Sequence, residues 1–85
     1  MIEGLKDKVV IVTGGGHGIG RAYCLGFGGA GAKVVVADID EPASVKVAKE
    51  VNSQTDAQSL WVKVDVANEA STQEMARLAL DRFGN

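Results

Sequence analysis

VVIVTGGGHGIG, the stretch from Val9 to Gly20, joins a β-branched apolar run to a cluster of glycines. The run Val9–Val12 predicts a strand that is buried on both faces, and the residues from Ile19 to about Gly29 predict a helix. Glycine lets the backbone turn sharply and approach a ligand closely, and the start of a helix offers unpaired N–H groups and the positive end of its dipole. The stretch therefore predicts a binding site for a phosphate group.

Two further strands are predicted, at Lys33–Ala37 and Leu60–Val64. The first is a continuous apolar run and is expected to be buried on both faces. The second alternates apolar residues with Trp61 and Lys63, which is typical of an edge strand with one less covered face.

Two further helices are predicted. One runs from Pro42 to about Asn52, with Asp40 or Glu41 as its N-cap. The other follows an Asn68 cap and ends before Gly84, which suits a left-handed C-terminal cap. Their apolar stripes consist of Ala43, Val47, Ala48 and Val51 in the first helix, and of Met75, Leu78, Ala79 and Phe83 in the second. The order β-α-β-α-β-α predicts an α/β protein, in which strands separated by helices pair in parallel and the helices pack on the sheet.

Composition excludes several classes of partner. The chain has 85 residues with 9 Lys and Arg against 11 Asp and Glu, so its net charge is −2, whereas nucleic-acid surfaces need a basic excess. We expect no membrane partner, because no apolar stretch approaches the roughly 20 residues of a membrane span and the N-terminus lacks the order of a signal peptide. Cys24 is the only cysteine, which favours a reducing, cytoplasmic location and a packed thiol.

The spacing of the glycines rules out two common phosphate loops. The fingerprint G-x-G-x-x-G requires glycine where Ile19 or Tyr23 stands, and the nucleoside-triphosphate loop requires Lys and Ser or Thr where Arg21 and Ala22 stand. The pattern that fits is T-G-x-x-x-G-I-G over Thr13–Gly20.

This pattern strongly resembles the cofactor loop of the short-chain dehydrogenase/reductase family, which follows the first strand of a Rossmann fold. The resemblance implies a sheet order 3-2-1. It also implies that Gly14 makes the turn, that Gly18 admits the cofactor pyrophosphate and that Gly20 lets the helix pack against the strand. Gly16 and Ile19 belong to the same expected cofactor loop. A glycine turn without a ligand is the alternative.

Asp38, at the end of the second strand, lies 18 positions after Gly20. An acidic residue in this place can accept hydrogen bonds from both hydroxyls of the adenosine ribose, and it would repel a 2′-phosphate. Since Gly16 and His17 supply no Arg or Lys in the loop, we predict NAD rather than NADP as the cofactor. Ile39 is included in the expected site. A helix cap is the other interpretation of this acidic pair, and it suits Asp40 better.

Two further contacts are expected. His17 is either a cofactor contact or an ordinary loop residue, and no catalytic role is expected of it. The resemblance implies that Asp65 accepts a hydrogen bond from the adenine amino group and that the Val66 amide faces a ring nitrogen. The alternative for Asp65 is a cap of the turn before Asn68.

The family's catalytic serine and its Tyr-x-x-x-Lys pair have no counterpart here. The only tyrosine, Tyr23, is followed four positions later by Phe27, so it is interpreted as a packing residue. We expect neither a catalytic residue nor a metal-ligand cluster.

Residues 1–85 are therefore expected to be the N-terminal, NAD(P)-binding part of a longer single-domain enzyme, inactive by itself. The longer enzyme would transfer hydride between NAD(H) and a small alcohol or carbonyl substrate, and we expect it to be a homo-oligomer. A stand-alone nucleotide-binding or interaction module is the alternative. Because the apolar first strand would lack its neighbouring fourth strand, the isolated chain is expected to be marginally stable, adhesive or self-associated.

Overall fold

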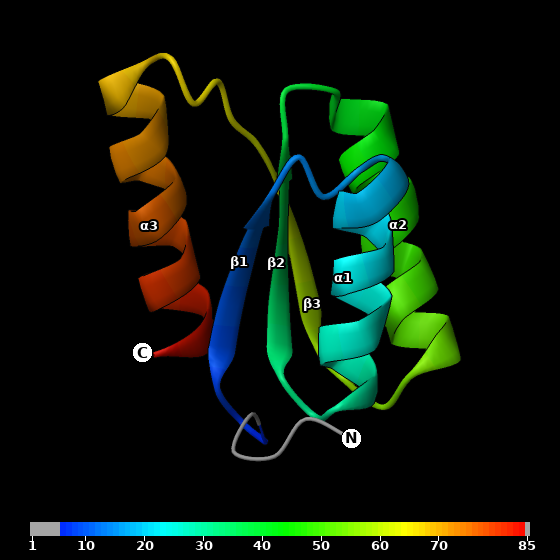
Figure 1. Ribbon diagram of the computed structural model, residues 1–85. Helices are drawn as coiled ribbons and strands as arrows, with labels where there is room; N and C mark the ends of the chain where they lie inside the picture. Colours follow the sequence, from blue (N-terminus) through cyan, green and yellow to red (C-terminus); the bar gives the residue numbers. More distant parts are fainter. Residues whose placement is uncertain (1–5, 85) are drawn as a thin grey trace.

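The computed structural model describes residues 6–84, and the remainder of the predicted 1–85 domain lies outside the described part. Three strands alternate with three helices (Figure 1). The elements are β1 (Val9–Thr13), α1 (Gly18–Gly29), β2 (Lys33–Asp38), α2 (Glu41–Gln54), β3 (Ser59–Lys63) and α3 (Glu69–Phe83). All strand pairs are parallel and the order is β1-β2-β3. The α/β prediction and the 3-2-1 order of a Rossmann-type half are confirmed.

The sheet lies between two helical layers, with α1 and α2 on one face and α3 on the other (Figure 1). Because β2 is the central strand, the side chains of residues 34–37 alternate between two separate cores and are fully buried. Val34 and Val36 pack with Val12, Cys24, Val47, Ala48 and Val51. Val35 and Ala37 pack with Val62, Val64, Met75, Ala79 and Phe83.

The ends of the helices follow the predicted capping residues. Asp40, rather than Glu41, is the N-cap of α2 and accepts a hydrogen bond from the Ala43 amide at 3.1 Å. Asn68 caps α3 in the same way, and Gly84 closes it with a φ of +76°.

One member of the predicted α2 stripe differs. Ser44 is fully buried, whereas Ala43 is only half-buried. The hydroxyl of Ser44 donates to the Asp40 carbonyl at 3.2 Å, so its burial leaves no unpaired polar group.

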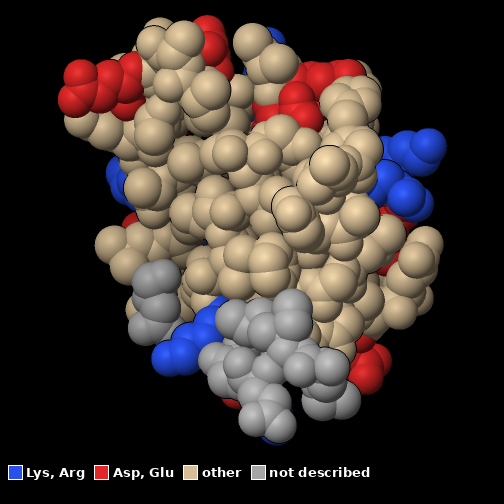
Figure 2. Space-filling view, in the orientation of Figure 1, with Lys and Arg blue, Asp and Glu red and all other residues tan. Residues whose placement is uncertain are grey.

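The two outer strands differ in how they meet their surroundings. Among the described residues β3 is an edge strand, as predicted, and exposes Trp61 and Lys63. The outer edge of β1 has no neighbouring strand within residues 6–84. A broad uncharged surface covers β1 and the adjoining part of α1 (Figure 2).

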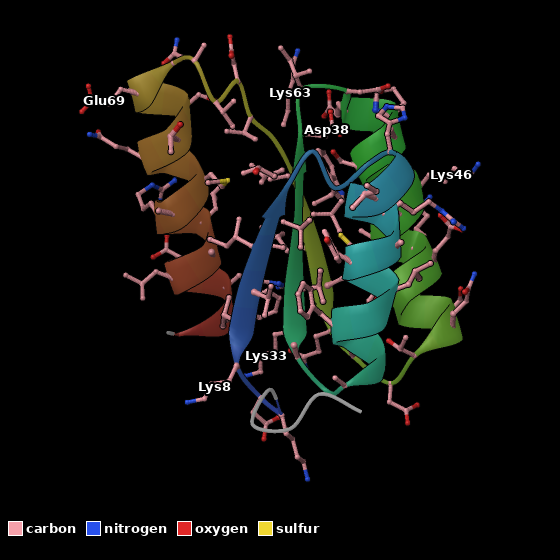
Figure 3. The ribbon with its side chains drawn as sticks, viewed as in Figure 1. Lys8, Lys33, Asp38, Lys46, Lys63 and Glu69 are labelled. Carbon is pink, nitrogen blue, oxygen red and sulfur yellow. The ribbon has the colours of Figure 1, made fainter. Side chains whose placement is uncertain are left out.

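The parallel register places the carboxyl ends of all three strands at one edge of the sheet. Thr13 pairs with Ala37, and Asp38 pairs with Lys63. Asp38 and Lys63 lie at this edge, while Lys8 and Lys33 lie at the opposite one (Figure 3). Ligands of open parallel sheets bind outside the carboxyl edge.

Candidate functional site

The glycine turn between β1 and α1 has backbone geometry that favours glycine. Gly14 and Gly18 have φ values of +70° and +50°. A Cβ on Gly20 would overlap the carbonyl oxygen of Gly14, so α1 starts directly against the turn. The close approach of Gly20 is thus to the turn that follows β1, whereas the prediction placed it against the strand itself.

The start of α1 is open to a ligand. The N-cap residue, His17, makes no side-chain capping bond, and the first turn contains no acidic residue. Apart from the adjoining residues of the chain, no atom lies within 4 Å of where a Cβ of Gly14 or Gly18 would stand. First-turn N–H groups that lack intrahelical partners, together with the helix dipole, favour an anion at this place.

Asp38 joins this turn to the end of β2. Its Oδ2 accepts from the Gly16 amide at 3.0 Å, and its Oδ1 accepts from the Asp40 amide at 3.0 Å. The Gly15 amide donates to the Ala37 carbonyl at 3.1 Å. Asp38 is only 7% exposed, so its carboxylate is held in one place by the main chain.

A second contact joins the turn to α2. The His17 Nε2 atom lies 2.9 Å from Oδ2 of Asp40, and both side chains are partly exposed. The hydrogen bond from the Ala43 amide, and then the one shared with His17, lower the pKa of Asp40 below its usual value of 3.8.

A cavity of about 180 Å³ opens at the same edge. Its lining combines the ends of all three strands and consists of Gly14, Asp38, Ile39, Val64, Asp65 and Val66. Ile39 and Val66 are 61% and 66% exposed, which leaves two aliphatic side chains free to cover an apolar ligand surface. Larger hollows of about 400 Å³ near Lys6–Val9 and about 430 Å³ near Gly28–Gly31 lie away from the glycine turn.

Five of the ten predicted site residues line this cavity, namely Gly14, Asp38, Ile39, Asp65 and Val66. The other five belong to the glycine turn and to the first helical turn of α1; they are Gly16, His17, Gly18, Ile19 and Gly20. Among these, Ile19 is 72% exposed. The prediction did not include Val64 in the site and made it the last residue of the third strand, whereas β3 ends at Lys63. Val64 is buried in the core on the α3 side of the sheet while also lining the cavity.

Asp65 also stabilises the turn before α3. Its Oδ1 accepts from the Ala67 amide at 3.0 Å, and its own amide donates to the Ser71 hydroxyl at 3.0 Å. The turn-capping alternative is thus present in the structure, and the residue lines the cavity as well.

The remaining reactive side chains lie away from the cavity lining. Cys24 is fully buried, and burial raises the pKa of its thiol to about 11. Tyr23 stacks on Phe27 with ring centroids 6.0 Å apart but is 56% exposed, so its packing is only partial. Within residues 6–84 no cluster of three His, Cys, Asp or Glu residues could hold a metal ion. In the same residues no helix is long and apolar enough to cross a membrane.

A parallel sheet with a glycine turn after its first strand and a buried acid at the end of its second defines a Rossmann-type α/β protein. Residues 8–85 match the family model described as short chain dehydrogenase. The chain belongs to this family of oxidoreductases.

Individual relatives agree with this assignment. A short chain dehydrogenase/reductase, astE, from Aspergillus oryzae is 41% identical over 94% of the chain. A short chain dehydrogenase/reductase from Burkholderia phymatum, crystallised with NAD, is 36% identical over the whole chain with a TM-score of 0.91. An Escherichia coli hydroxysteroid dehydrogenase is 33% identical over 95% of it, with a TM-score of 0.91. The chain spans 31%, 30% and 33% of these three proteins, respectively.

Proposed function

We propose that residues 1–85 form the adenosine-diphosphate side of a nicotinamide dinucleotide site. The observation that carries this proposal is the cavity at the carboxyl edge, where Asp38 and Asp65 flank an opening next to the glycine turn. The presence of NAD in the crystals of the Burkholderia phymatum relative supports the same class of ligand.

Each part of the site has a distinct task in this proposal. The pyrophosphate lies over the backbone of Gly14 and Gly18, at the N-terminus of α1. The adenine occupies the cavity between the aliphatic side chains of Ile39 and Val66, with the amide of Val66 facing a ring nitrogen. The carboxylate of Asp65 accepts from the adenine amino group.

Asp38 binds the ribose hydroxyls of the adenosine. Each of its oxygens accepts one main-chain hydrogen bond, and a carboxylate oxygen has a second lone pair. The buried charge therefore retains acceptors for two hydroxyls, and it disfavours a 2′-phosphate by repulsion. The Arg21 guanidinium, the nearest one in sequence to the turn, is engaged by Glu50. We therefore propose NAD in preference to NADP.

We propose further that this segment is the cofactor-binding portion of a longer enzyme that transfers hydride between NAD(H) and an alcohol or carbonyl compound. Residues 1–85 supply binding and orientation for that reaction but contain no Tyr-x-x-x-Lys pair, so we propose that they are inactive by themselves. A homo-oligomeric state of the longer enzyme and a cytoplasmic location belong to the same proposal.

Titration of the ¹⁵N-labelled 85-residue chain with NADH, followed by amide chemical shifts, tests the proposal. The expected shifts centre on residues 14–20, 38–39 and 65–66, and ADP-ribose reproduces them because it contains the bound half of the cofactor. The variant Asp38→Ala is the matched control and should weaken binding. A well-dispersed wild-type spectrum, which shows a folded chain, that stays unchanged with NADH overturns the proposal.

A further inference from the structure

Gly16 is the only residue of the glycine turn that contacts the Asp38 side chain through a hydrogen bond among the described residues. The two residues are 22 positions apart in sequence, and both are buried. A Cβ on Gly16 would lie 2.8 Å from the Ala43 Cβ and 3.0 Å from Oδ2 of Asp38. The space beside the carboxylate is therefore closed to any side chain at this position.

This closed space fixes the direction of the carboxylate. The amides of Gly16 and Asp40 hold its two oxygens from different sides. A carboxylate that is already oriented loses little conformational freedom when hydroxyls bind to it. A methyl group at position 16 would push the turn away from α2, lengthen the Gly16–Asp38 hydrogen bond and release the carboxylate.

We propose that Gly16 is a positioning residue that sets the preference of the site for a cofactor whose adenosine carries no 2′-phosphate. This inference rests on the proposed function. Gly16 acts through Asp38, and Ala43 is the wall that excludes a side chain beside the carboxylate. The charge of Asp38 repels a 2′-phosphate only while the carboxylate is held toward the ribose. The absence of a side chain at Gly16 therefore contributes to specificity in addition to the absence of a basic group there.

The test compares Gly16→Ala with a rescue variant and a matched control. Gly16→Ala should lower the ratio of the NADPH and NADH dissociation constants about tenfold, since a charge-assisted hydrogen bond is lost. Adding Ala43→Gly removes the closest of the contacts that the new methyl group makes, and should restore part of the lost ratio, because the 3.0 Å contact with Oδ2 of Asp38 remains. Gly26→Ala places a methyl group in open space within α1 and should leave the ratio unchanged.

A purely structural role gives different results. If Gly16 only supported the fold, Gly16→Ala would weaken the binding of NADH and the binding of NADPH by the same factor, and that outcome overturns the proposal. In an Asp38→Ala background, Gly16→Ala should leave the ratio unchanged, because the carboxylate through which Gly16 acts is missing. A further fall of the ratio in that background also overturns it.

The outcomes separate this inference from the proposed function. If wild type binds NADH in preference to NADPH and Gly16→Ala keeps the wild-type ratio, only the role of Gly16 fails. If wild type binds neither dinucleotide, both fail. If Gly16→Ala does not fold, the hydrogen-exchange rate of the Gly16 amide in wild type and in Asp38→Ala tests the proposal instead. The exchange should accelerate in Asp38→Ala, and unchanged exchange overturns the proposal.

Discussion

The imidazole Nε2 atom of His17 lies 2.9 Å from Oδ2 of Asp40, the N-cap residue of α2. This contact joins the glycine turn to the start of α2. The other oxygen of Asp40 accepts the Ala43 amide. One carboxylate thus caps a helix and contacts the turn at the same time. The hydrogen bond from the Ala43 amide and the contact with His17 both stabilise the charged form of Asp40.

Acid should therefore weaken the fold through Asp40. Its pKa is lowered in the folded chain, so its contribution to stability is fully present above the usual value of 3.8 and is lost as the pH falls through the folded value. Asp40→Asn keeps a good capping side chain but does not titrate. Thermal unfolding of both proteins between neutral pH and about pH 2 should show a steeper acid loss for wild type. Parallel pH profiles would contradict the prediction.

Two glycines of α1 should respond in opposite directions to alanine. A Cβ on Gly28 would lie 2.9 Å from Cγ1 of Val51 in α2, whereas one on Gly26 would meet no atom within 4 Å. Gly26→Ala should stabilise the chain by about 0.5–1 kcal/mol by favouring the helix. Gly28→Ala should destabilise it by about 1–3 kcal/mol through overpacking. Urea unfolding of the two variants measures both effects, and equal changes would contradict the close packing of α1 on α2.

The thiol of Cys24 should be inert while the chain is folded. It is fully buried beneath the glycine turn, 3.8 Å from the Gly15 carbonyl, and its pKa is raised to about 11. Labelling with a chromogenic disulfide at mildly alkaline pH should be at least about tenfold slower in native buffer than in guanidinium chloride, since the thiolate is the reacting form. Equal rates would show that the core around Cys24 opens freely.

A charge beside the free edge of β1 should reduce self-association. Ile11 is 38% exposed in the strand whose outer edge is unpaired within residues 6–84. Ile11→Lys should lower the average mass in sedimentation at high protein concentration, because a lysine on an edge strand opposes pairing with another chain. Ala76→Lys adds the same charge on the exposed side of α3 and is the control. An equal effect of both variants would indicate a simple change in net charge.

The local patterns in the sequence were sufficient to predict the order and the approximate positions of the helices and strands. Capping of α3 by Asn68 and Gly84 depends on residues within a few positions of each other, so its prediction succeeded. The choice between Asp40 and Glu41 stayed open, because both can cap and only the backbone geometry distinguishes them. A side chain is excluded at Gly28 because α2 packs against it, whereas Gly26 has open space beside it. No local pattern in the sequence shows where α2 packs.

By itself the sequence determined the α/β order, the parallel sheet and the glycine turn, because these follow from apolar periodicity, glycine spacing and the connections between strands. Only the tertiary structure decided that the Gly16 amide meets the Asp38 carboxylate, that His17 meets Asp40 and that Val64 lines the cavity. These contacts join residues from different elements. Their distances are set by strand register and by the packing of α1 against α2, both of which require the assembled core.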